Sequence, residues 1–432
     1  MRSIIAPATP AMASPPAETN DARPSSFVVP SRETARRIQS FIATAPELGP
    51  RYARAKEFRR ILRQVSNFDL TSRCNLRCEG CFYFEGDDYK QATEQEDLAR
   101  WQTFFEDQAR RGVTFASIAG AEPALEQDRL QIANRCIPRG VIFTNGTIKI
   151  RPSINYSIVI SIWGDAGTTE AFRGGGVFWK ALKTHKGDRR ARALFMVHAK
   201  NIGQISEVTR IVSDHGIRLS FNYFSPTNSY LEKLAAESKN DDEFFRISSK
   251  EDNFLLTPDA LERARDTIDD MIDLYPETVF HTHAFNRVCT NPTGLYDVDP
   301  DTGIATNCGG RNFQWHQSYR VDLKPSNAKC CTPNVNCKDC RLNAVALASL
   351  LFRLDRFVGS IQEFRDWLDI CEQYGRSNLL DTDPVWSVGM SQVATLHLAA
   401  HATLQSHRPF QAPGSPLVGD VPESRNAPRP AA

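Results

Sequence analysis

The sequence predicts an α/β fold: a partial (βα)6, TIM-like barrel with a Cys-rich C-terminal extension and terminal helices. Three observations favour it. Between Phe68 and Pro226, short apolar runs alternate about six times with amphipathic stretches. Each stretch is long enough to return the chain to the start of a parallel neighbouring strand. The cysteines gather in two groups, one directly after the first apolar run and one beyond the barrel.

The apolar runs are expected to form a parallel sheet. The expected strands are Asn67–Thr71, Thr114–Ala119, Gly140–Thr144, Tyr156–Ile162, Ala193–His198 and Arg218–Phe224. Helical periodicity between them predicts helices at Glu94–Arg111, Glu126–Arg135, Val177–Lys186 and Ile205–His215. Gly216 follows the last of these and is typical of a helix end. Because such sheets carry their chemistry at the carboxyl ends of the strands, functional residues are expected in the loops that follow them.

Composition divides the chain into regions. We expect a disordered N-terminal segment (1–30), a helical lead-in (31–66), the barrel (67–226), a connecting helical segment (227–288), a Cys-rich region (289–342), C-terminal helices (343–407) and a disordered Pro-rich tail (408–432). The connecting segment has one clear helix near Pro258–Leu274. Helices at Asn343–Phe357, Ile361–Tyr374 and Val385–Leu404 are expected to cover the open side of the barrel. The two end segments are rich in Ala, Pro and Ser, a composition that does not build a core.

Charge and cysteine usage exclude several classes of partner. The net charge of the 432-residue chain is +1, which does not favour a nucleic-acid or membrane surface. No apolar run approaches the roughly 18 residues of a membrane span. Prolines at 7 and 10 interrupt the only segment that resembles a secretion signal. Eleven clustered cysteines indicate metal or redox sites in a reducing compartment, so a cytoplasmic location is expected.

The first cysteine group has the spacing Cys-x3-Cys-x2-Cys and consists of Cys74, Cys78 and Cys81. Three thiolates on one short loop can hold three irons of a cubane [4Fe–4S] cluster and leave the fourth iron without a protein ligand. A cluster used only for electron transfer normally has four thiolates. The missing ligand therefore indicates a site kept open for a small molecule; the alternative is a structural zinc site.

The segment Cys74-Asn-Leu-Arg-Cys78-Glu-Gly-Cys81, after a strand, resembles the radical S-adenosylmethionine (radical SAM) family. In that family the amino and carboxylate groups of SAM chelate the open iron. The resemblance implies a SAM-binding [4Fe–4S] cluster and SAM as cofactors, and an electron donor such as flavodoxin or ferredoxin as partner. It also implies reductive cleavage of SAM to a 5′-deoxyadenosyl radical that abstracts hydrogen from a substrate.

Further motifs at the strand ends resemble the SAM-binding segments of this family. Gly120-Ala121-Glu122-Pro123 resembles its Gly-Gly-Glu-Pro motif, although Ala replaces the second Gly. That motif implies that the backbone and the Glu122 carboxylate bind the SAM ammonium group, a suitable pairing of charges. The other SAM-binding positions implied by the resemblance are Asn145, Ser161 and Asn201.

The adenine-binding position departs from the family pattern. The family usually has an aromatic residue immediately before the third cysteine, where this chain has Gly80. Phe82 or Tyr83 would supply a stacking face instead, or would pack into the core. These two alternatives stay open at the level of sequence.

The second cysteine group comprises Cys289, Cys308, Cys330, Cys331, Cys337 and Cys340. It is similar to the SPASM and Twitch extensions of radical SAM enzymes, which carry auxiliary [4Fe–4S] clusters, although its last spacing is x2 where those extensions have x3. The resemblance implies an auxiliary cluster whose ligands are Cys308, Cys330, Cys337 and Cys340, with Cys331 and Cys289 as alternates. A zinc site built from four of these thiols is the alternative.

Three functions are compatible with these motifs. The favoured one is a radical SAM enzyme acting on a small-molecule biosynthetic substrate. A SPASM-type maturase that modifies a ribosomally synthesised peptide is the second, and a non-catalytic iron–sulfur or zinc protein is the third. The sequence identifies no catalytic side chain, although Tyr223 and Ser225 end the sixth expected strand and are candidates to face the substrate.

Overall fold

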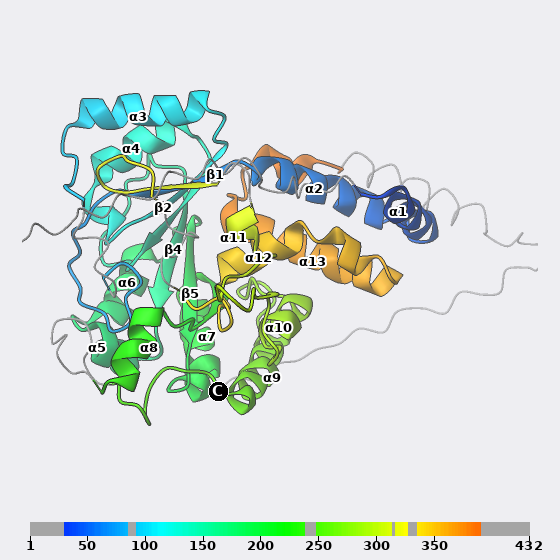
Figure 1. Ribbon diagram of the computed structural model, residues 1–432. Helices are drawn as coiled ribbons and strands as arrows, with labels where there is room; N and C mark the ends of the chain where they lie inside the picture. Colours follow the sequence, from blue (N-terminus) through cyan, green and yellow to red (C-terminus); the bar gives the residue numbers. More distant parts are fainter. Residues whose placement is uncertain (1–29, 85–91, 238–247, 313–315, 327–334, 390–432) are drawn as a thin grey trace, which may run out of the picture.

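The computed structural model describes residues 30–84, 92–237, 248–312, 316–326 and 335–389 (Figure 1). Its centre is a parallel sheet with the strand order β6-β5-β4-β3-β2-β1-β7. The strands are β1 (Val65–Asp69), β2 (Phe115–Ala119), β3 (Gly140–Thr144), β4 (Ser157–Ile162), β5 (Ala191–Val197), β6 (Arg218–Tyr223) and β7 (Gln317–Tyr319). The sheet is not closed, because β6 and β7 are its two edges. The partial α/β barrel predicted from the sequence is confirmed.

The seventh strand corrects the sequence-based picture of the extension. The sequence pattern of Tyr319–Leu323, within the Cys-rich region, predicts a strand there. The structure instead forms β7 at Gln317–Tyr319 and pairs it with β1, with Phe68 opposite Tyr319. The rings of these two residues stack with their centroids 5.6 Å apart. Part of the C-terminal half therefore extends the barrel sheet.

Helices cover the outer face of the sheet, as Figure 1 shows. They are α3 (Leu98–Arg110), α4 (Gln127–Cys136), α5 (Ala166–Arg173), α6 (Val177–His185) and α7 (Ile205–Asp214), with short helices η2 (Pro123–Leu125) and η3 (Ile202–Gln204). In α7 the buried residues Ile205, Val208 and Val212 form one apolar stripe. Gly216 follows with a φ of 64°, which favours glycine and ends the helix. Because these helices shield the sheet, β4 is buried along almost its whole length, and four of its six residues are Ile or Val.

Helix α5 was not predicted from the sequence. It is only eight residues long, so its amphipathic pattern spans little more than two turns. The Asp165 side chain begins it by accepting a hydrogen bond from the Thr168 N–H. Its last residue, Arg173, reaches the cysteine loop, as described below.

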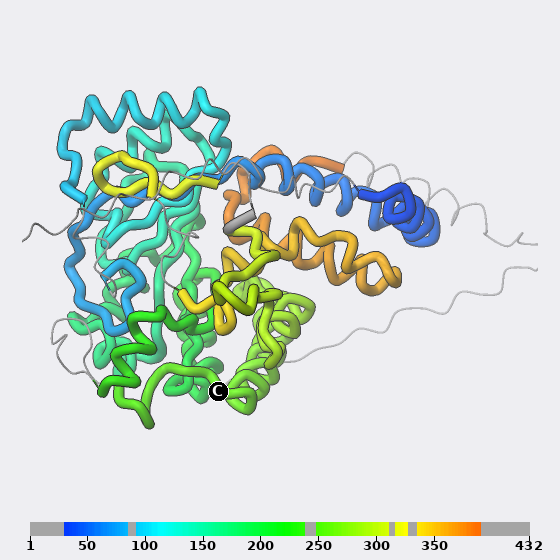
Figure 2. The backbone as a smooth tube through the Cα atoms, in the orientation of Figure 1, coloured from blue at the N-terminus to red at the C-terminus, as the bar shows by residue number. Residues whose placement is uncertain are grey.

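The remaining helices are α1 (Arg32–Thr44), α2 (Leu48–Ile61), α8 (Asn228–Ala235), α9 (Pro258–Leu274), α10 (His283–Cys289), α11 (Gly309–Asn312), α12 (Asn343–Leu351), η4 (Leu354–Phe357), α13 (Ile361–Asn378) and η5 (Pro384–Ser387). Figure 2 shows the N-terminal helices running beside α13. Arg51 of α2 binds Asp369 and Glu372 of α13. All three predicted C-terminal helices have different bounds. The first stops at Leu351 and the second continues to Asn378. The expected Val385–Leu404 starts as a short 3-10 turn, and its part beyond 389 lies outside the described residues.

Helices α12 and α13 close the barrel. At the β6 edge, the Asn343 side chain donates to the Phe221 carbonyl at 3.0 Å. At the amino ends of the strands, the Ser377 carbonyl of α13 accepts a hydrogen bond from Arg192 of β5 at 3.1 Å. Within the described ranges, none of the helices combines the length and apolar character needed to cross a bilayer.

Candidate active site

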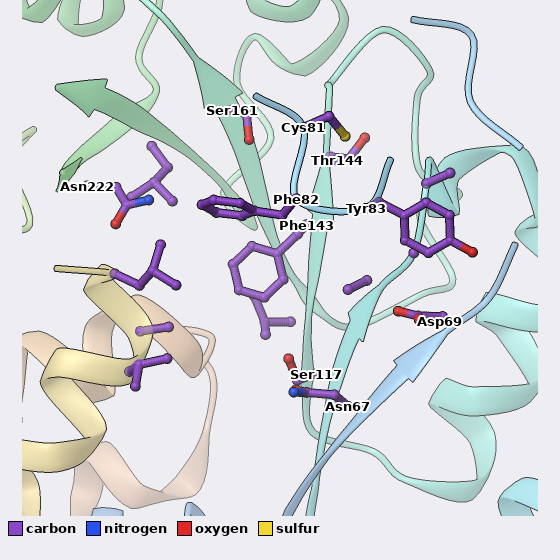
Figure 3. Close-up of a pocket in the computed structure, with 18 of the residues that line it drawn as sticks. Asn67, Asp69, Cys81, Phe82, Tyr83, Ser117, Phe143, Thr144, Ser161 and Asn222 are labelled. Atoms are coloured by element: carbon purple, nitrogen blue, oxygen red, sulfur yellow. The ribbon is translucent and has the colours of Figure 1, made fainter. Parts of the chain in front are cut away.

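A cavity of about 750 Å³ occupies the barrel interior (Figure 3). Alternate residues of the strands line it, as expected for the inner face of a barrel. On β5, for example, these are Arg192, Leu194 and Met196. The cysteine loop lies at the carboxyl end of the strands, and residues of α12 and α13 complete the wall. The cavity therefore extends from the three cysteines along the barrel to the C-terminal helices.

All three cysteines of the first group line this cavity, and none forms a disulfide. The Leu76 N–H donates to the Cys74 sulfur at 3.4 Å, and the Arg173 Nε–H donates to the Cys78 sulfur at 3.4 Å. Burial raises the pKa of Cys81 to about 12, and it also raises the pKa of Cys74. A bound metal cation would offset this burial and deprotonate the thiols.

The donor set fits an iron–sulfur cluster with one open iron. Three unpaired thiols share a cavity wall, two of them receive N–H hydrogen bonds, and the cavity beyond them has room for a second molecule. Among the described residues, no group of three His, Cys, Asp or Glu side chains is arranged to hold a single metal ion.

Glu122 lines the cavity but directs much of its hydrogen-bonding capacity into the protein. It is 1% exposed, and its carboxylate accepts from the Ala124 N–H at 3.0 Å, the Thr144 hydroxyl at 2.6 Å and the Asn145 N–H at 2.7 Å. Burial raises its pKa, and these hydrogen bonds oppose the rise. The carboxylate thus joins the end of β2 to the end of β3 beside the cysteines.

Asn145 ties the same corner to the cysteine loop. Its side-chain amide donates to the side-chain oxygen Oδ1 of Asn75 at 2.8 Å, and the Asn75 side-chain nitrogen in turn donates to the Thr147 hydroxyl at 2.9 Å. Asn75 follows Cys74 directly. Sequence reasoning recognised Asn145 as a site residue but did not assign this positioning role to Asn75, which has no spacing signal of its own.

Gly120 and Ala121 also border the cavity. Gly120 has a φ of 108°, and a Cβ atom there would lie 2.9 Å from the Thr71 carbonyl oxygen. Only glycine fits this close approach of the β2 end to the cysteine loop. At the next position, where alanine replaces the family's glycine, the Ala121 N–H donates to the same carbonyl at 3.0 Å.

Ser161 of β4 lines the cavity (Figure 3), and so does Arg173. The Arg173 guanidinium donates to the Ser161 carbonyl and to the Cys78 sulfur, which places a buried cation at the cysteine loop. Sequence reasoning missed Arg173, because it ends a short helix that was not predicted. A guanidinium at this position suits a thiolate or a carboxylate.

Asn201 is not brought to the cavity. Its side chain accepts from the His198 N–H at 2.9 Å and donates to the carbonyls of Met196 at 2.7 Å and Trp163 at 3.1 Å. These bonds use the amide to shape the loop after β5. The structure places Asn201 apart from the other expected SAM-binding residues, which all line the cavity.

Aromatic and acidic side chains complete the wall. Phe82 and Tyr83, the two candidates for stacking on adenine, both line the cavity (Figure 3). Asp69, the last residue of β1, lines it as well, and burial raises its pKa to about 7. Sequence reasoning did not single out Asp69. By contrast, Tyr223 is fully buried and donates to Asn286 at 2.6 Å.

The second cysteine group is partly described. Cys308, Cys337 and Cys340 lie in one small apolar cluster, against which Phe82 of the first cysteine loop packs. Cys330, expected as the fourth ligand, and its alternate Cys331 lie outside the described residues. Cys289 ends α10 in the main core, where burial raises its pKa. Three of the four residues named for an auxiliary cluster thus share one buried region next to the first loop.

No protein-family model matches the sequence. A curated relative, the pre-heme d1 synthase of Dinoroseobacter shibae, is 30% identical over 166 residues, which cover 35% of this chain and 40% of that protein. The match therefore spans less than half of the relative's length.

Solved structures with a similar arrangement include Streptococcus suis SuiB bound to S-adenosylmethionine, with a TM-score of 0.41, 16% identity and coverage of 60% of this chain and 58% of that chain. Another is anSMEcpe with bound AdoMet, with a TM-score of 0.41, 13% identity and coverage of 79% and 100%. A structure of anSMEcpe with AdoMet and the Cp18Cys peptide gives 0.40, 14%, 79% and 99%.

The fold and the site define a class of protein: a partial α/β barrel with a three-thiol loop at the mouth of its central cavity. The curated relative, pre-heme d1 synthase, is a radical SAM enzyme. Over the 166 matched residues, this chain is similar to that enzyme.

Proposed function

We propose that this protein reductively cleaves S-adenosylmethionine and abstracts hydrogen from a small-molecule biosynthetic substrate. One observation supports this proposal above the others: Cys74, Cys78 and Cys81 share a wall of a cavity that continues into the barrel. A site for electron transfer alone would need no such space.

A [4Fe–4S] cluster held by these thiolates would supply one electron to SAM, breaking its sulfur–C5′ bond to give a 5′-deoxyadenosyl radical. An electron donor such as a flavodoxin or ferredoxin would act as partner. The chain's own contribution is positioning. Glu122 and Asn145 fix the loops around the cysteines, and Arg173 offers a cation beside the Cys78 sulfur.

The C-terminal helices along the cavity support a small substrate. Residues of α12 and α13 line the wall opposite the cysteine loop and close the barrel at its edge and its far end. A carbon radical has to form against its substrate and away from water, or it is quenched. We propose in addition that Cys308, Cys337 and Cys340, with Cys330, hold an auxiliary cluster beside this cavity.

The test is SAM cleavage by the anaerobically reconstituted protein. With dithionite and SAM, the wild type is expected to produce 5′-deoxyadenosine, measured by liquid chromatography. Replacing Cys74, Cys78 and Cys81 together by Ala should abolish the product and remove about four irons. Cys136→Ala is the matched control, because Cys136 lies on α4 outside the cavity lining.

Two results would refute the proposal. One is 5′-deoxyadenosine formation by the triple variant at the wild-type rate. The other is zinc, with no iron, in the reconstituted wild type.

A further inference from the structure

Arg192 is a buried cation on the cavity wall that the chemistry at the cysteine loop does not use. It lies on β5 and is 5% exposed. With Leu194 and Met196 it forms the row of β5 side chains that line the cavity. Its position is near the amino end of the strand, away from the cysteines.

The Arg192 guanidinium is only partly satisfied. One terminal nitrogen donates to the Ser377 carbonyl at 3.1 Å, whereas the Nε and Nη1 atoms are buried and make no hydrogen bond within the described part of the chain. Burial lowers the pKa of Arg192 to about 10, with a contribution from the neighbouring Arg218 cation. No carboxylate of the described residues forms an ion pair with it. Burying a charge without a partner is costly, so an anion at this position would be strongly favoured.

Strand register places Arg192 nearer the amino ends of the strands than the expected SAM site. Ser161 of β4 pairs with Leu194 of β5, and Arg192 is two residues nearer the amino end. At about 3.3 Å per residue, Arg192 is about 7 Å deeper in the barrel than Ser161. A molecule between these two levels would lie within the cavity, between the cysteine loop and α13.

We propose that Arg192 binds a carboxylate of the substrate and holds it on the side of the expected SAM site that faces the amino ends of the strands. This inference rests on the proposed function for the identity of the bound molecule. A carboxylate fits better than a phosphate, because a single guanidinium with two unpartnered nitrogens balances one negative charge. The substrate class is therefore a small carboxylic acid.

The test uses succinate and its neutral analogue succinamide as probes, with methyl phosphate as the alternative anion. The melting temperature of the reconstituted protein with SAM, without reductant, is measured at constant ionic strength. Succinate at 10 mM is expected to raise the melting temperature of the wild type by about 2 °C or more, and succinamide should not. Arg192→Met and Arg192→Gln should remove the succinate response.

The control is Arg218→Met. Arg218 lies opposite Arg192 in the β5–β6 register but pairs with Asp381 and does not line the cavity. It should keep the full response to succinate. The melting temperature without probe tests whether Arg192 has only a structural role. Without probe, Arg192→Met is expected to melt at or above the wild-type temperature, because it removes a buried charge.

Four results would overturn the inference. They are an absent response in the wild type, an equal response in both Arg192 variants, a larger Arg192-dependent response to methyl phosphate, and a lower melting temperature of Arg192→Met without probe. The readout requires no SAM cleavage. An inactive wild type would therefore remove the proposed function without deciding this test.

Discussion

Glu122 organises the site through hydrogen bonds to the protein. Its carboxylate accepts hydrogen bonds from Ala124, Thr144 and Asn145, so it fixes two strand ends at once. The family resemblance implied a direct contact with the SAM ammonium group. The structure adds that most of this carboxylate's acceptor capacity is already committed to the protein.

We predict that Glu122→Gln destabilises the protein by about 1–3 kcal/mol, because an amide cannot accept all three hydrogen bonds and leaves a buried donor unpaired. Urea unfolding followed by circular dichroism measures this loss. The control is Glu106→Gln on the exposed face of α3, expected to change stability by less than about 0.5 kcal/mol. Equal stability of the two variants would contradict the role assigned to Glu122.

Asp69 predicts a pH dependence. Its folded pKa is about 7, raised by burial above its ordinary value. Between that ordinary value and about pH 7, the folded state holds a proton that the unfolded state has lost, so stability falls as pH rises through this window. Asp69→Asn should therefore be more stable than the wild type at pH 8, with the difference shrinking as the pH falls towards 4.

Melting temperatures across this pH range provide the measurement. Asp107→Asn, on the exposed surface of α3, is the control and should run parallel to the wild type. A constant difference between Asp69→Asn and the wild type at all pH values would show that Asp69 is ionised throughout.

Among single residues, the short motifs identified which residues lie at the site more reliably than they identified what each side chain contacts. Glu122, Asn145 and Ser161 all line the cavity, as their positions after or on strands suggested. Asn201 follows a strand in the same way, yet its amide binds backbone carbonyls. Sequence order cannot decide between these outcomes, because the three-dimensional path of each loop determines where its polar side chain points. Arg192 was missed because a single arginine in a buried strand carries no spacing signal.

At the scale of elements, α13 holds the closed end of the barrel through its packing on α2. Gly375 of α13 lies against the Phe58 ring, and a Cβ atom there would be 2.7 Å from the nearest ring carbon. The same helix presents the Ser377 carbonyl to Arg192. The contact between the helices therefore also determines the geometry of the cavity floor.

Gly375→Ala is expected to lower stability by about 1–3 kcal/mol, because overpacking outweighs the usual helix gain from alanine. The matched control is Gly49→Ala in α2, where the added Cβ would meet only Ile42, at 3.4 Å. That change should be neutral or stabilising by up to about 1 kcal/mol. Denaturant midpoints measure both, and a stabilised Gly375→Ala would contradict the packing described.

The elements with strong periodicity were predicted well. Gly140–Thr144 and Pro258–Leu274 have the bounds expected from the sequence. Elements that depend on distant partners were not: α5 is too short for a clear pattern, and β7 exists because residues 317–319 pair with β1, some 250 positions earlier. The local sequence does not indicate a pairing with so distant a segment.

In the molecule as a whole, the three-thiol loop borders the cavity inside the barrel. The parallel sheet brings the loops after its strands to one end, and α12 and α13 close the edge and the opposite end. The apolar cluster that contains Cys308, Cys337 and Cys340 packs against the first loop through Phe82. This arrangement provides the space beside the three thiols that the proposed function requires.

The iron content tests the organisation of the two cysteine groups. Reconstitution should yield about eight irons per chain if both clusters form, and about four in the Cys308→Ala, Cys337→Ala, Cys340→Ala variant. Iron analysis and visible absorbance measure this. About four irons in both proteins would remove the auxiliary cluster and leave the first site unaffected.

The Mössbauer spectrum of the iron-reconstituted protein, with and without SAM, tests most directly whether the first cysteine group holds a cluster with one open iron. A cluster held by Cys74, Cys78 and Cys81 would have one iron without a protein ligand, so SAM is expected to alter the signal of one iron in that cluster. The variant lacking these three thiols should show no such change. A wild-type spectrum that SAM leaves unchanged would show that SAM does not bind an open iron at this loop.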